Sequence, residues 1–398
     1  MQERWRPHVP VGHLWFAAGL ALGIVFLAVF GFIDIWAASL GQSDFSGFWA
    51  GPRAVLDGVN PYATAGFPTI VAKYGTQRTD AVYGYPPWDL ALLLPFALVP
   101  ERVAAIAWTA VGIGVAIYGL GTLLRREVPG SPTVQLLAGL ALFASQPAII
   151  TFYSGQWGFL LLGALALSAR WQRDGRSARA ALAAIAMVAK PQLFVFAAWA
   201  MARQAVARGD RAFVAVSGIG GAVLIGVAWL AFPDWLHAFL NYITPTRTSY
   251  PPHSVTLATP LGQLLGPGGL WLAIPIIVVV LAVALRFRPS AAAWLPVWLA
   301  ASITLTTYSW SYDHVVLIVP IVLAVGAARS PRRALTIGLV GFTALLVEAP
   351  LLYQLAVVRG TQSLNVLVPF TVLAVIVACL WPFARDRSRE RAAVLATN

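Results

Sequence analysis

The chain has 398 residues, of which 59% are hydrophobic and only 11% are charged, whereas an ordinary soluble domain has about 45–50% apolar and about 25% charged residues. This composition excludes a soluble globular protein. Apolar runs separated by short arginine-rich loops continue from end to end, so we treat residues 1–398 as one membrane-embedded unit without a separate soluble domain. The single cysteine, Cys379, excludes a disulfide framework and a cysteine-based metal site.

The fold class predicted from these runs is an all-α polytopic membrane protein. Spanning the hydrocarbon takes about 20 apolar residues, and the chain offers about 12 candidate spans by this criterion. In chain order they lie at about 14–35, 103–124, 133–151, 156–171, 178–189, 192–207, 211–232, 268–286, 291–308, 313–328, 333–353 and 364–384.

The distribution of arginine predicts how these spans are oriented. The 27 Lys and Arg outnumber the 15 Asp and Glu, but they are scattered in small clusters between the spans, which indicates topology and not nucleic-acid binding. Assigning the arginine-rich loops to the cytoplasm places both termini in the cytoplasm as well. The membrane that we expect is the plasma membrane. The loops that then face outward are 36–102, 152–155, 233–267, 309–312 and 354–363, of which 36–102 is the first outer loop and 233–267 the second large one.

Three stretches are predicted to depart from regular spans. The apolar run at 85–100 would put Arg125 and Arg126 outside if it crossed the membrane, so we expect an interfacial or re-entrant helix. A second interfacial helix is expected to begin near Ser43. The spans 178–189 and 192–207 are individually short and meet at a Lys-Pro pair, which is typical of irregular backbone lining a cavity.

Few ionisable residues lie near the membrane, which makes each of them informative. Asp44 follows the first span at the start of an aromatic-rich segment, where it could cap a helix or act as a general base at the membrane surface. Lys190 ends the sequence AAIAMVAK at membrane depth. Its ammonium could extend to the interface, but the adjoining proline turn favours a polar cavity in which it binds a lipid phosphate.

Other candidates lie at the outward ends of later spans. His314 follows Tyr312 and Asp313, where it could be a satisfied structural residue or could help hold a phosphate or a sugar. Gln156 could cap a helix or donate hydrogen bonds to hydroxyl or phosphate oxygens. In the outer loop 233–267 the cationic candidates are Arg247 and His253, although a solvated connector is at least as good an interpretation of that loop.

Several motifs are absent from the sequence. It contains no P-loop, no GxSxG elbow and no HExxH or CxxC pair. The motifs therefore argue against ATP hydrolysis and zinc proteolysis, and we predict no metal and no cofactor. The candidate residues all fall on the outward side of a topology derived independently from the arginines.

Taken together, the motifs resemble a known family. The chain contains DFSGFW and LDGVNPY, then YGYPPWDLALLLPFALVP, then SGQWG and VAKPQ, and finally SYDHVVLIVPIVLA. Their order and spacing resemble glycosyltransferase family 87, over roughly residues 40 to 330. These are membrane enzymes of GT-C architecture, which include polyprenyl-phosphate-mannose-dependent mannosyltransferases that build phosphatidylinositol mannosides.

The resemblance implies a GT-C-type bundle of about a dozen helices, in which the first outer loop carries interfacial helices and the catalytic aspartate. It implies that Asp44 is the general base, that His314 is the important late histidine, and that Lys190 and Gln156 lie near the donor phosphate. Arg247 and His253 are added here as candidate phosphate ligands. One departure is Asp89 in WDL, where the family more often has an aliphatic run.

The expected reaction is inverting transfer of a sugar, mannose by family, from a polyprenyl-phosphate donor to a hydroxyl of a lipid- or glycan-linked acceptor on the outer face. A departing phosphate is a weak base, so one catalytic base suffices, with attack from the opposite face. The partners expected are these two substrates and membrane lipids, without nucleic acid.

Aromatic side chains serve two purposes in this hypothesis. Most of the 16 Trp are expected to form belts at the membrane interfaces, while Trp49, Tyr85 and Tyr312 are candidate walls of the substrate site. A transporter or flippase of a lipid-linked sugar is the alternative. It would predict inverted repeats and helices broken near the midplane, and no clear internal repeat is present.

Overall fold

A computed structural model describes residues 11–32, 44–63, 67–74, 83–248, 255–265, 275–276, 278–279, 291–306 and 308–380. Throughout these described residues the ordered elements are helices and none is a strand. The longer helices are α1 (Val11–Phe32), α3 (Asp44–Leu56), α6 (Glu101–Glu127), α7 (Pro132–Ala144), α9 (Gly158–Arg173), α11 (Val195–Ala207), α12 (Arg211–Ala231), α13 (Trp235–Thr248), α16 (Ala291–Thr304) and α18 (Pro331–Thr343). Shorter elements are α4 (Phe67–Tyr74), α5 (Pro87–Ala97), α8 (Gln146–Ser154), α10 (Ser177–Ile185), η1 (Ala186–Ala189), η2 (Pro191–Leu193), α14 (Ala258–Leu265), η3 (Ser311–Leu317), α17 (Ile318–Ala327), η4 (Ala344–Glu348), α19 (Ala349–Arg359) and η5 (Ser363–Val366).

The described helices confirm a membrane protein and part of the predicted span pattern. Four helical stretches are long and apolar enough to cross a membrane: Glu101–Glu127, Arg211–Ala231, Pro331–Arg359 and Ser363–Leu380. A fifth span results if α7 and α8, which are bent by 40° against each other, are counted together. The total of about twelve spans stays a prediction, and most of the expected span 268–286 lies outside the described residues.

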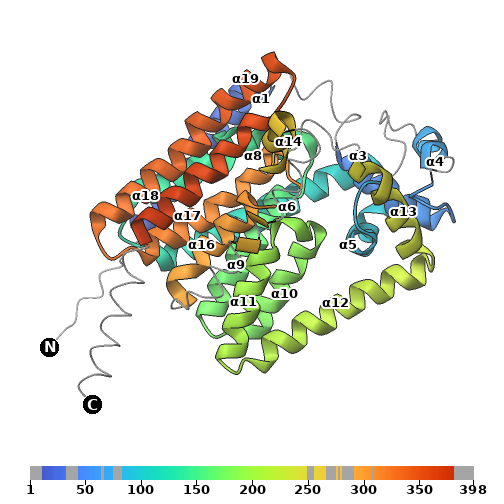
Figure 1. Ribbon diagram of the computed structural model, residues 1–398, viewed down its shortest axis with the longest axis horizontal. Helices are drawn as coiled ribbons and strands as arrows, with labels where there is room; N and C mark the ends of the chain where they lie inside the picture. The colour runs from blue at the N-terminus through green and yellow to red at the C-terminus, as the bar shows by residue number, and fades with distance from the viewer. Residues whose placement is uncertain are drawn as a thin grey trace, which may run out of the picture.

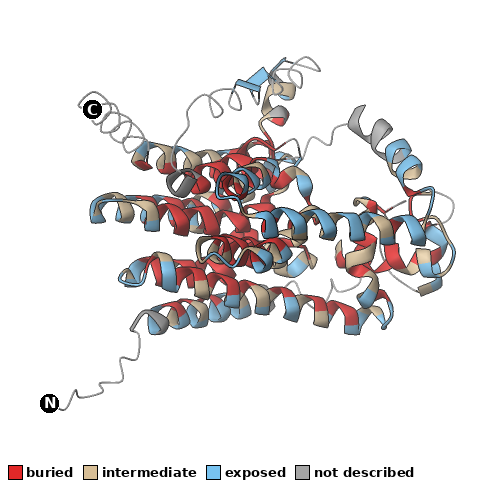
Figure 2. Ribbon diagram, turned by 90° about the horizontal axis from the view of Figure 1, so that it is seen from below, coloured by how far each residue is buried: buried red, intermediate tan, exposed pale blue. Residues whose placement is uncertain are grey.

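Two helices form the centre of the bundle. Most residues of α9 and of α17 are buried, and Figure 2 shows buried residues concentrated along the middle of the helical bundle. Helix α6 lies against α9 at a contact built from two glycines. A Cβ on Gly119 would lie 2.5 Å from the Gly163 carbonyl oxygen, and one on Gly163 would lie 2.4 Å from that of Val115. Only the absence of side chains there lets the two backbones meet.

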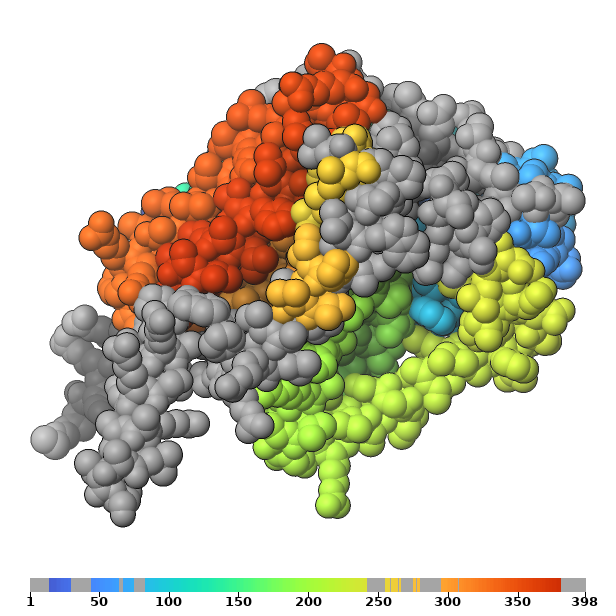
Figure 3. Space-filling model, viewed as in Figure 1, coloured from blue at the N-terminus to red at the C-terminus, as the bar shows by residue number. Residues whose placement is uncertain are grey.

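The outer surface of the bundle is apolar, as a lipid-facing surface requires. Helix α12 runs along one edge of the molecule (Figure 1 and Figure 3), and only 11% of its most apolar window is buried inside the protein. Ile219, Val223 and Leu230 are among its exposed apolar side chains. Exposed apolar surface on this scale is stable against hydrocarbon and not against water.

One end of the bundle carries helices from the two segments that are predicted to be large outer loops, 36–102 and 233–267. Helices α3, α4, α5 and α13 gather there (Figure 1). Helix α5 has 11 residues, which is too few to cross the hydrocarbon. That α5 lies at the membrane interface stays a prediction. Helix α3 begins at Asp44, next to the expected start at Ser43. After α3, Lys73 and Tyr74 donate hydrogen bonds to Asp57 and thereby lower the pKa of that carboxyl.

The opposite end of α6 carries an arginine network. Arg126 and Arg170 both pair with Asp174, and Arg173 pairs with Glu127, which ties the end of α6 to the end of α9. Trp108 lies near the start of α6, so about 18 residues at 1.5 Å each separate it from Arg126, or roughly 27 Å. The basic end and the end with α3 are therefore far apart, as the predicted orientation requires.

The predicted break at Lys190 is confirmed. The segment runs from α10 through the 3-10 turn η1 to Lys190, and then through a second 3-10 turn, η2, into α11. Lys190 itself has φ −132° and ψ 68°, outside the helical region. Pro191 has no N–H to continue the helix and restricts the residue before it. The chain therefore turns inside the bundle and presents a lysine there.

Candidate functional site

Four polar side chains from four separate segments form one connected cluster. Gln156 Nε2 donates to Asp44 Oδ2 at 2.5 Å. The Lys190 Nζ donates to Gln156 Oε1 at 3.2 Å and to Asp313 Oδ1 at 2.7 Å. We call Asp44, Gln156, Lys190 and Asp313 the polar cluster. It links the start of α3, the α8–α9 turn, the break after η1, and η3.

The α8–α9 turn places Gln156 by a glycine in the left-handed region. Gly155 has φ 62° and caps the C-terminus of α8, a conformation that glycine adopts without steric cost. A Cβ on Gly155 would also lie 2.7 Å from the Cβ of Phe45. Its carbonyl oxygen accepts a hydrogen bond of 2.8 Å from Trp108 Nε1. The turn is thus held between α3 and α6, and it sets the position of the Gln156 side chain.

Lys190 is held from several sides. It is 4% exposed, so it does not extend to the protein surface. Besides Asp313 and Gln156, the face of the Tyr312 ring lies 4.6 Å from Nζ, a cation–π geometry. Asp313 Oδ2 in turn accepts from the backbone N–H of Trp310 at 2.9 Å. A buried ammonium is stable only with such partners.

Asp44 is the accessible member of the cluster. It is partly exposed, whereas the other three are no more than 4% exposed. It lies in the first turn of α3, where the helix dipole favours a carboxylate. One oxygen is oriented by Gln156. A partly exposed, oriented carboxylate backed by buried polar groups can accept a proton from a bound hydroxyl.

Aromatic rings surround the cluster on the α3 side. Tyr85 accepts a hydrogen bond from Gln156 Nε2 at 3.3 Å through its hydroxyl, and its ring packs edge-on against Phe48 with centroids 4.6 Å apart. Trp108 and Trp157 lie edge-on at 4.6 Å. These rings exclude water and give a low-dielectric wall in which hydrogen bonds to charged groups are stronger.

Of the site residues expected from the sequence, the structure brings these together: Asp44, Gln156, Lys190, Tyr85 and Tyr312. Trp49 is buried elsewhere: its Nε1 donates to the Val99 carbonyl at 2.9 Å, and its ring packs against Tyr74. Arg247 lies in α13, but its side chain and all of His253 lie outside the described residues.

Two buried ionisable residues stand apart from the hydrogen-bonded cluster. His314 is 0% exposed, and neither ring nitrogen has a hydrogen-bond partner among the described residues. Asp89 on α5 is also 0% exposed, with both oxygens unpartnered within the same part of the chain. Lys190 is the charged group that attracts Asp89 electrostatically. The neighbouring Trp88 Nε1 donates to the Val188 carbonyl at 2.7 Å, which ties α5 to the break.

Asp313 was not predicted as a site residue, although it is the direct partner of Lys190. A signal was present, because a lysine at membrane depth needs an anion and Asp313 is one of few acidic residues in the apolar segments. The sequence could not say which carboxylate the fold would bring to Lys190, 123 residues away.

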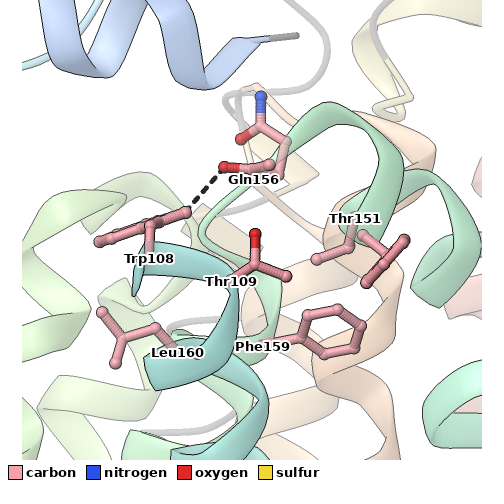
Figure 4. Close-up of a pocket in the computed structure, with 9 residues that line it drawn as sticks. Trp108, Thr109, Thr151, Gln156, Phe159 and Leu160 are labelled. Carbon is pink, nitrogen blue, oxygen red and sulfur yellow. Dashed lines mark hydrogen bonds between the residues drawn. The ribbon is translucent and has the colours of Figure 1, made fainter. Parts of the chain in front are cut away.

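A small hollow lies beside the polar cluster, with Gln156 in its lining. It lies between α6 and the α8–α9 segment and is lined by Trp108, Thr109, Gly112, Thr151, Phe152, Gly155, Gln156, Phe159 and Leu160. Figure 4 shows the Gln156 amide at one end of this site and the side chains of Phe159 and Leu160 at the other. Thr109, Phe152 and Leu160 are partly exposed, whereas Gln156 is buried.

Comparison with family models gives a match over part of the chain. The model of glycosyltransferase family 87 matches residues 83–249, a segment that contains Tyr85, Gln156 and Lys190. This confirms the resemblance drawn from the motifs. No curated protein and no solved structure matches the chain. Among the described residues no three His, Cys, Asp or Glu side chains are grouped as metal ligands would be.

Proposed function

We propose that this chain, a glycosyltransferase by its match to family 87 over residues 83–249, transfers a sugar with inversion from a polyprenyl-phosphate donor to a hydroxyl of a lipid- or glycan-linked acceptor. The proposed sugar is mannose, and the proposed location is the outer face of a plasma membrane with both termini in the cytoplasm. The observation that carries the proposal is a partly exposed carboxylate, Asp44, oriented by Gln156 next to a buried lysine.

The proposed reaction is a single displacement. Asp44 accepts the proton of the acceptor hydroxyl, and the acceptor oxygen forms a bond to the anomeric carbon from the face opposite the phosphate. The bond between that carbon and the phosphate oxygen breaks, and its electron pair goes to the phosphate. The products are the inverted glycoside and polyprenyl phosphate, with the proton on Asp44. Phosphate is a weak base when it departs, so the reaction needs no separate general acid.

Lys190 is the proposed phosphate ligand. An ammonium has three N–H donors, and Asp313 and Gln156 accept two of them. The third can meet a phosphate oxygen and stabilise the charge that develops on it. Asp313 pairs with Lys190 and holds it in place inside the protein. We assign Arg247 and His253 a supporting role at the phosphate, and His314 a place beside the reacting groups through its neighbours Tyr312 and Asp313.

Replacing Asp44 by Asn tests the base. The amide keeps the size and can still hydrogen-bond to Gln156, but it cannot take a proton, and a general base contributes about 10²–10⁴-fold to a rate. We expect at least a ~100-fold fall in sugar transfer by reconstituted Asp44→Asn protein. The matched control is Asp57→Asn, a carboxylate one residue beyond the end of α3 that pairs with Lys73. Near wild-type transfer by folded Asp44→Asn would exclude Asp44 as the base.

A further inference from the structure

Three aromatic side chains lie at alternate positions at the start of η3: Tyr308, Trp310 and Tyr312. The Trp310 backbone is extended, with φ −124° and ψ 164°, and side chains two residues apart along an extended chain lie on the same side of it. Tyr308 is 39% exposed, and Trp310 and Tyr312 are partly exposed. We call these three residues the aromatic strip.

The two serines between the rings are turned inward and hold the backbone. Ser309 and Ser311 are 0% and 2% exposed. Ser309 Oγ donates to the Val255 carbonyl oxygen at 2.6 Å, and the Ser309 carbonyl oxygen accepts from the Val255 N–H at 2.8 Å. Ser311 Oγ accepts from Gln146 Nε2 at 3.3 Å. The backbone under the strip is therefore fixed, and a ligand would not have to order this segment when it binds.

The rings of the strip connect the exposed surface with the polar cluster. Trp310 Nε1 donates to the Tyr308 hydroxyl at 2.7 Å, and these two rings lie edge-on with centroids 6.3 Å apart. The rings of Trp310 and Tyr312 are nearly parallel, at 14° and 6.4 Å. The Tyr312 ring in turn lies 4.6 Å from Lys190 Nζ, and its hydroxyl interacts electrostatically with Asp44. The strip thus ends at the residues proposed to react.

Such a strip has the chemistry that recognises sugars. A pyranose ring has an apolar side formed by its C–H groups, which pack against the electron-rich face of an aromatic ring, and hydroxyls around its edge. Tyr and Trp combine such a face with a polar tip that can hydrogen-bond to those hydroxyls. Tyr and Trp also anchor proteins at membrane interfaces. An anchor needs no particular position relative to a catalytic carboxylate, whereas this strip leads to Lys190 and Asp44.

The position of the strip assigns it to the acceptor. The donor of the proposed reaction carries a single sugar, which must lie at Lys190 and Asp44 for the transfer to occur. The strip continues outward from Tyr312 by two further rings, in steps of 6.4 and 6.3 Å. It therefore extends beyond the place of the transferred sugar, and of the two substrates only an acceptor saccharide continues in that direction.

We propose that the aromatic strip positions the acceptor by stacking against its sugar rings, with the terminal sugar at Tyr312 and the preceding sugar at Trp310 and Tyr308. The inference rests on the proposed function and adds residues that determine which acceptors are used. Trp310 is central to it, because its ring lies between the other two. All three are positioning residues: they hold the acceptor hydroxyl at Asp44 and take no proton themselves.

Three substitutions in the strip and one outside it form the test. Trp310→Ala removes the central ring, Trp310→Phe keeps a ring but loses the Nε1 donor, and Tyr308→Leu removes the outermost ring. The control is Trp229→Ala on α12, a tryptophan that is 54% exposed on the surface that faces lipid. The Trp310 N–H that donates to Asp313 is a backbone group and is kept in every variant. Tyr308→Leu keeps the test decisive if Trp310→Ala does not fold, because the Tyr308 side chain is exposed.

The first measurement is binding of octyl mannobioside and octyl mannoside to the protein in lipid nanodiscs, by microscale thermophoresis. We expect wild type to prefer the disaccharide, and Trp310→Ala to lose about tenfold in affinity for it and most of this preference. Trp310→Phe should lose less, and Trp229→Ala should bind as wild type does. Equal affinities in wild type and the folded strip variants would overturn the inference, as would a wild type that does not prefer the disaccharide. Rings that only anchor the protein in the membrane would give this result.

Kinetics separate the inference from the proposed function. With decaprenyl-phosphate-mannose as donor and octyl mannobioside as acceptor, the strip variants should raise the acceptor KM by about the same factor as the Kd, with kcat and the donor KM little changed. A rise in the donor KM instead would place the donor on the strip and overturn the inference. Asp44→Asn should bind octyl mannobioside as wild type does. A wild type that binds this disaccharide through the strip but transfers no sugar to it would refute the proposed function and not the strip.

Discussion

Removing either member of the buried Lys190–Asp313 ion pair should destabilise the protein by about 3–5 kcal/mol. The two atoms are 2.7 Å apart, and the side chains are 5% and 2% exposed. At an effective dielectric constant of about 20, two unit charges at that distance attract by roughly 6 kcal/mol. Desolvation of both ions offsets much of this attraction, but a single substitution leaves one charge buried without its partner.

The two partners can be separated by a double-mutant cycle. The variants are Lys190→Met, Asp313→Asn and the double variant. Asn at 313 can still accept from the Trp310 N–H, so the turn at η3 keeps its cap. In the double variant neither charge remains, and the loss of stability should be no greater than in the single variants. The coupling energy between the two positions should then be at least about 2 kcal/mol, at the upper end for neighbouring residues.

Unfolding in mixed detergent micelles measures these free energies directly. The control is the Lys73–Asp57 pair, whose atoms are also close at 2.8 Å but whose lysine side chain is 59% exposed. Solvent screens that pair, so Lys73→Met and Asp57→Asn should have much smaller effects with little coupling. If the effects at 190 and 313 simply add, or are no larger than those at 73 and 57, then the buried pair does not hold the break at Lys190 in place.

Two further predictions concern packing and a buried carboxylate. Gly163→Val should lower the unfolding free energy by about 1–3 kcal/mol through overpacking, because its Cβ would lie 2.4 Å from the Val115 carbonyl oxygen. A Cβ on Gly114 would have no atom within 4 Å, so Gly114→Val should cost less than half as much in the same unfolding assay. Neither oxygen of Asp89 has a hydrogen-bond partner among the described residues, and an unsatisfied buried polar group usually costs about 1–3 kcal/mol. Asp89→Leu should therefore raise the unfolding free energy by about that amount. A loss of stability instead would show that Asp89 is a required counter-charge of Lys190.

The sequence alone predicted that this protein lies in a membrane, and it predicted several local features. Apolar content and arginine placement depend only on composition along the chain, so they predicted an all-helical membrane protein, which the described helices support, and an orientation of its two ends, which stays a prediction. Pro191 lacks an N–H, so the helix break at Lys190 was also predictable. The motifs, which are local strings, indicated a resemblance to glycosyltransferase family 87, whose model matches residues 83–249, and they gave Asp44, Gln156 and Lys190 as candidate site residues.

Only the tertiary structure decided which of these residues meet. Asp44 and Gln156 are 112 residues apart, and Lys190 and Asp313 are 123 apart, and no pattern along the chain specifies such a pairing. The same limit explains why Trp49 was expected at the site but packs against Tyr74. Asp313 was not found for this reason, because its role is defined by a contact between distant segments. Helix packing fixes these contacts, and packing depends on side-chain shapes from distant segments together.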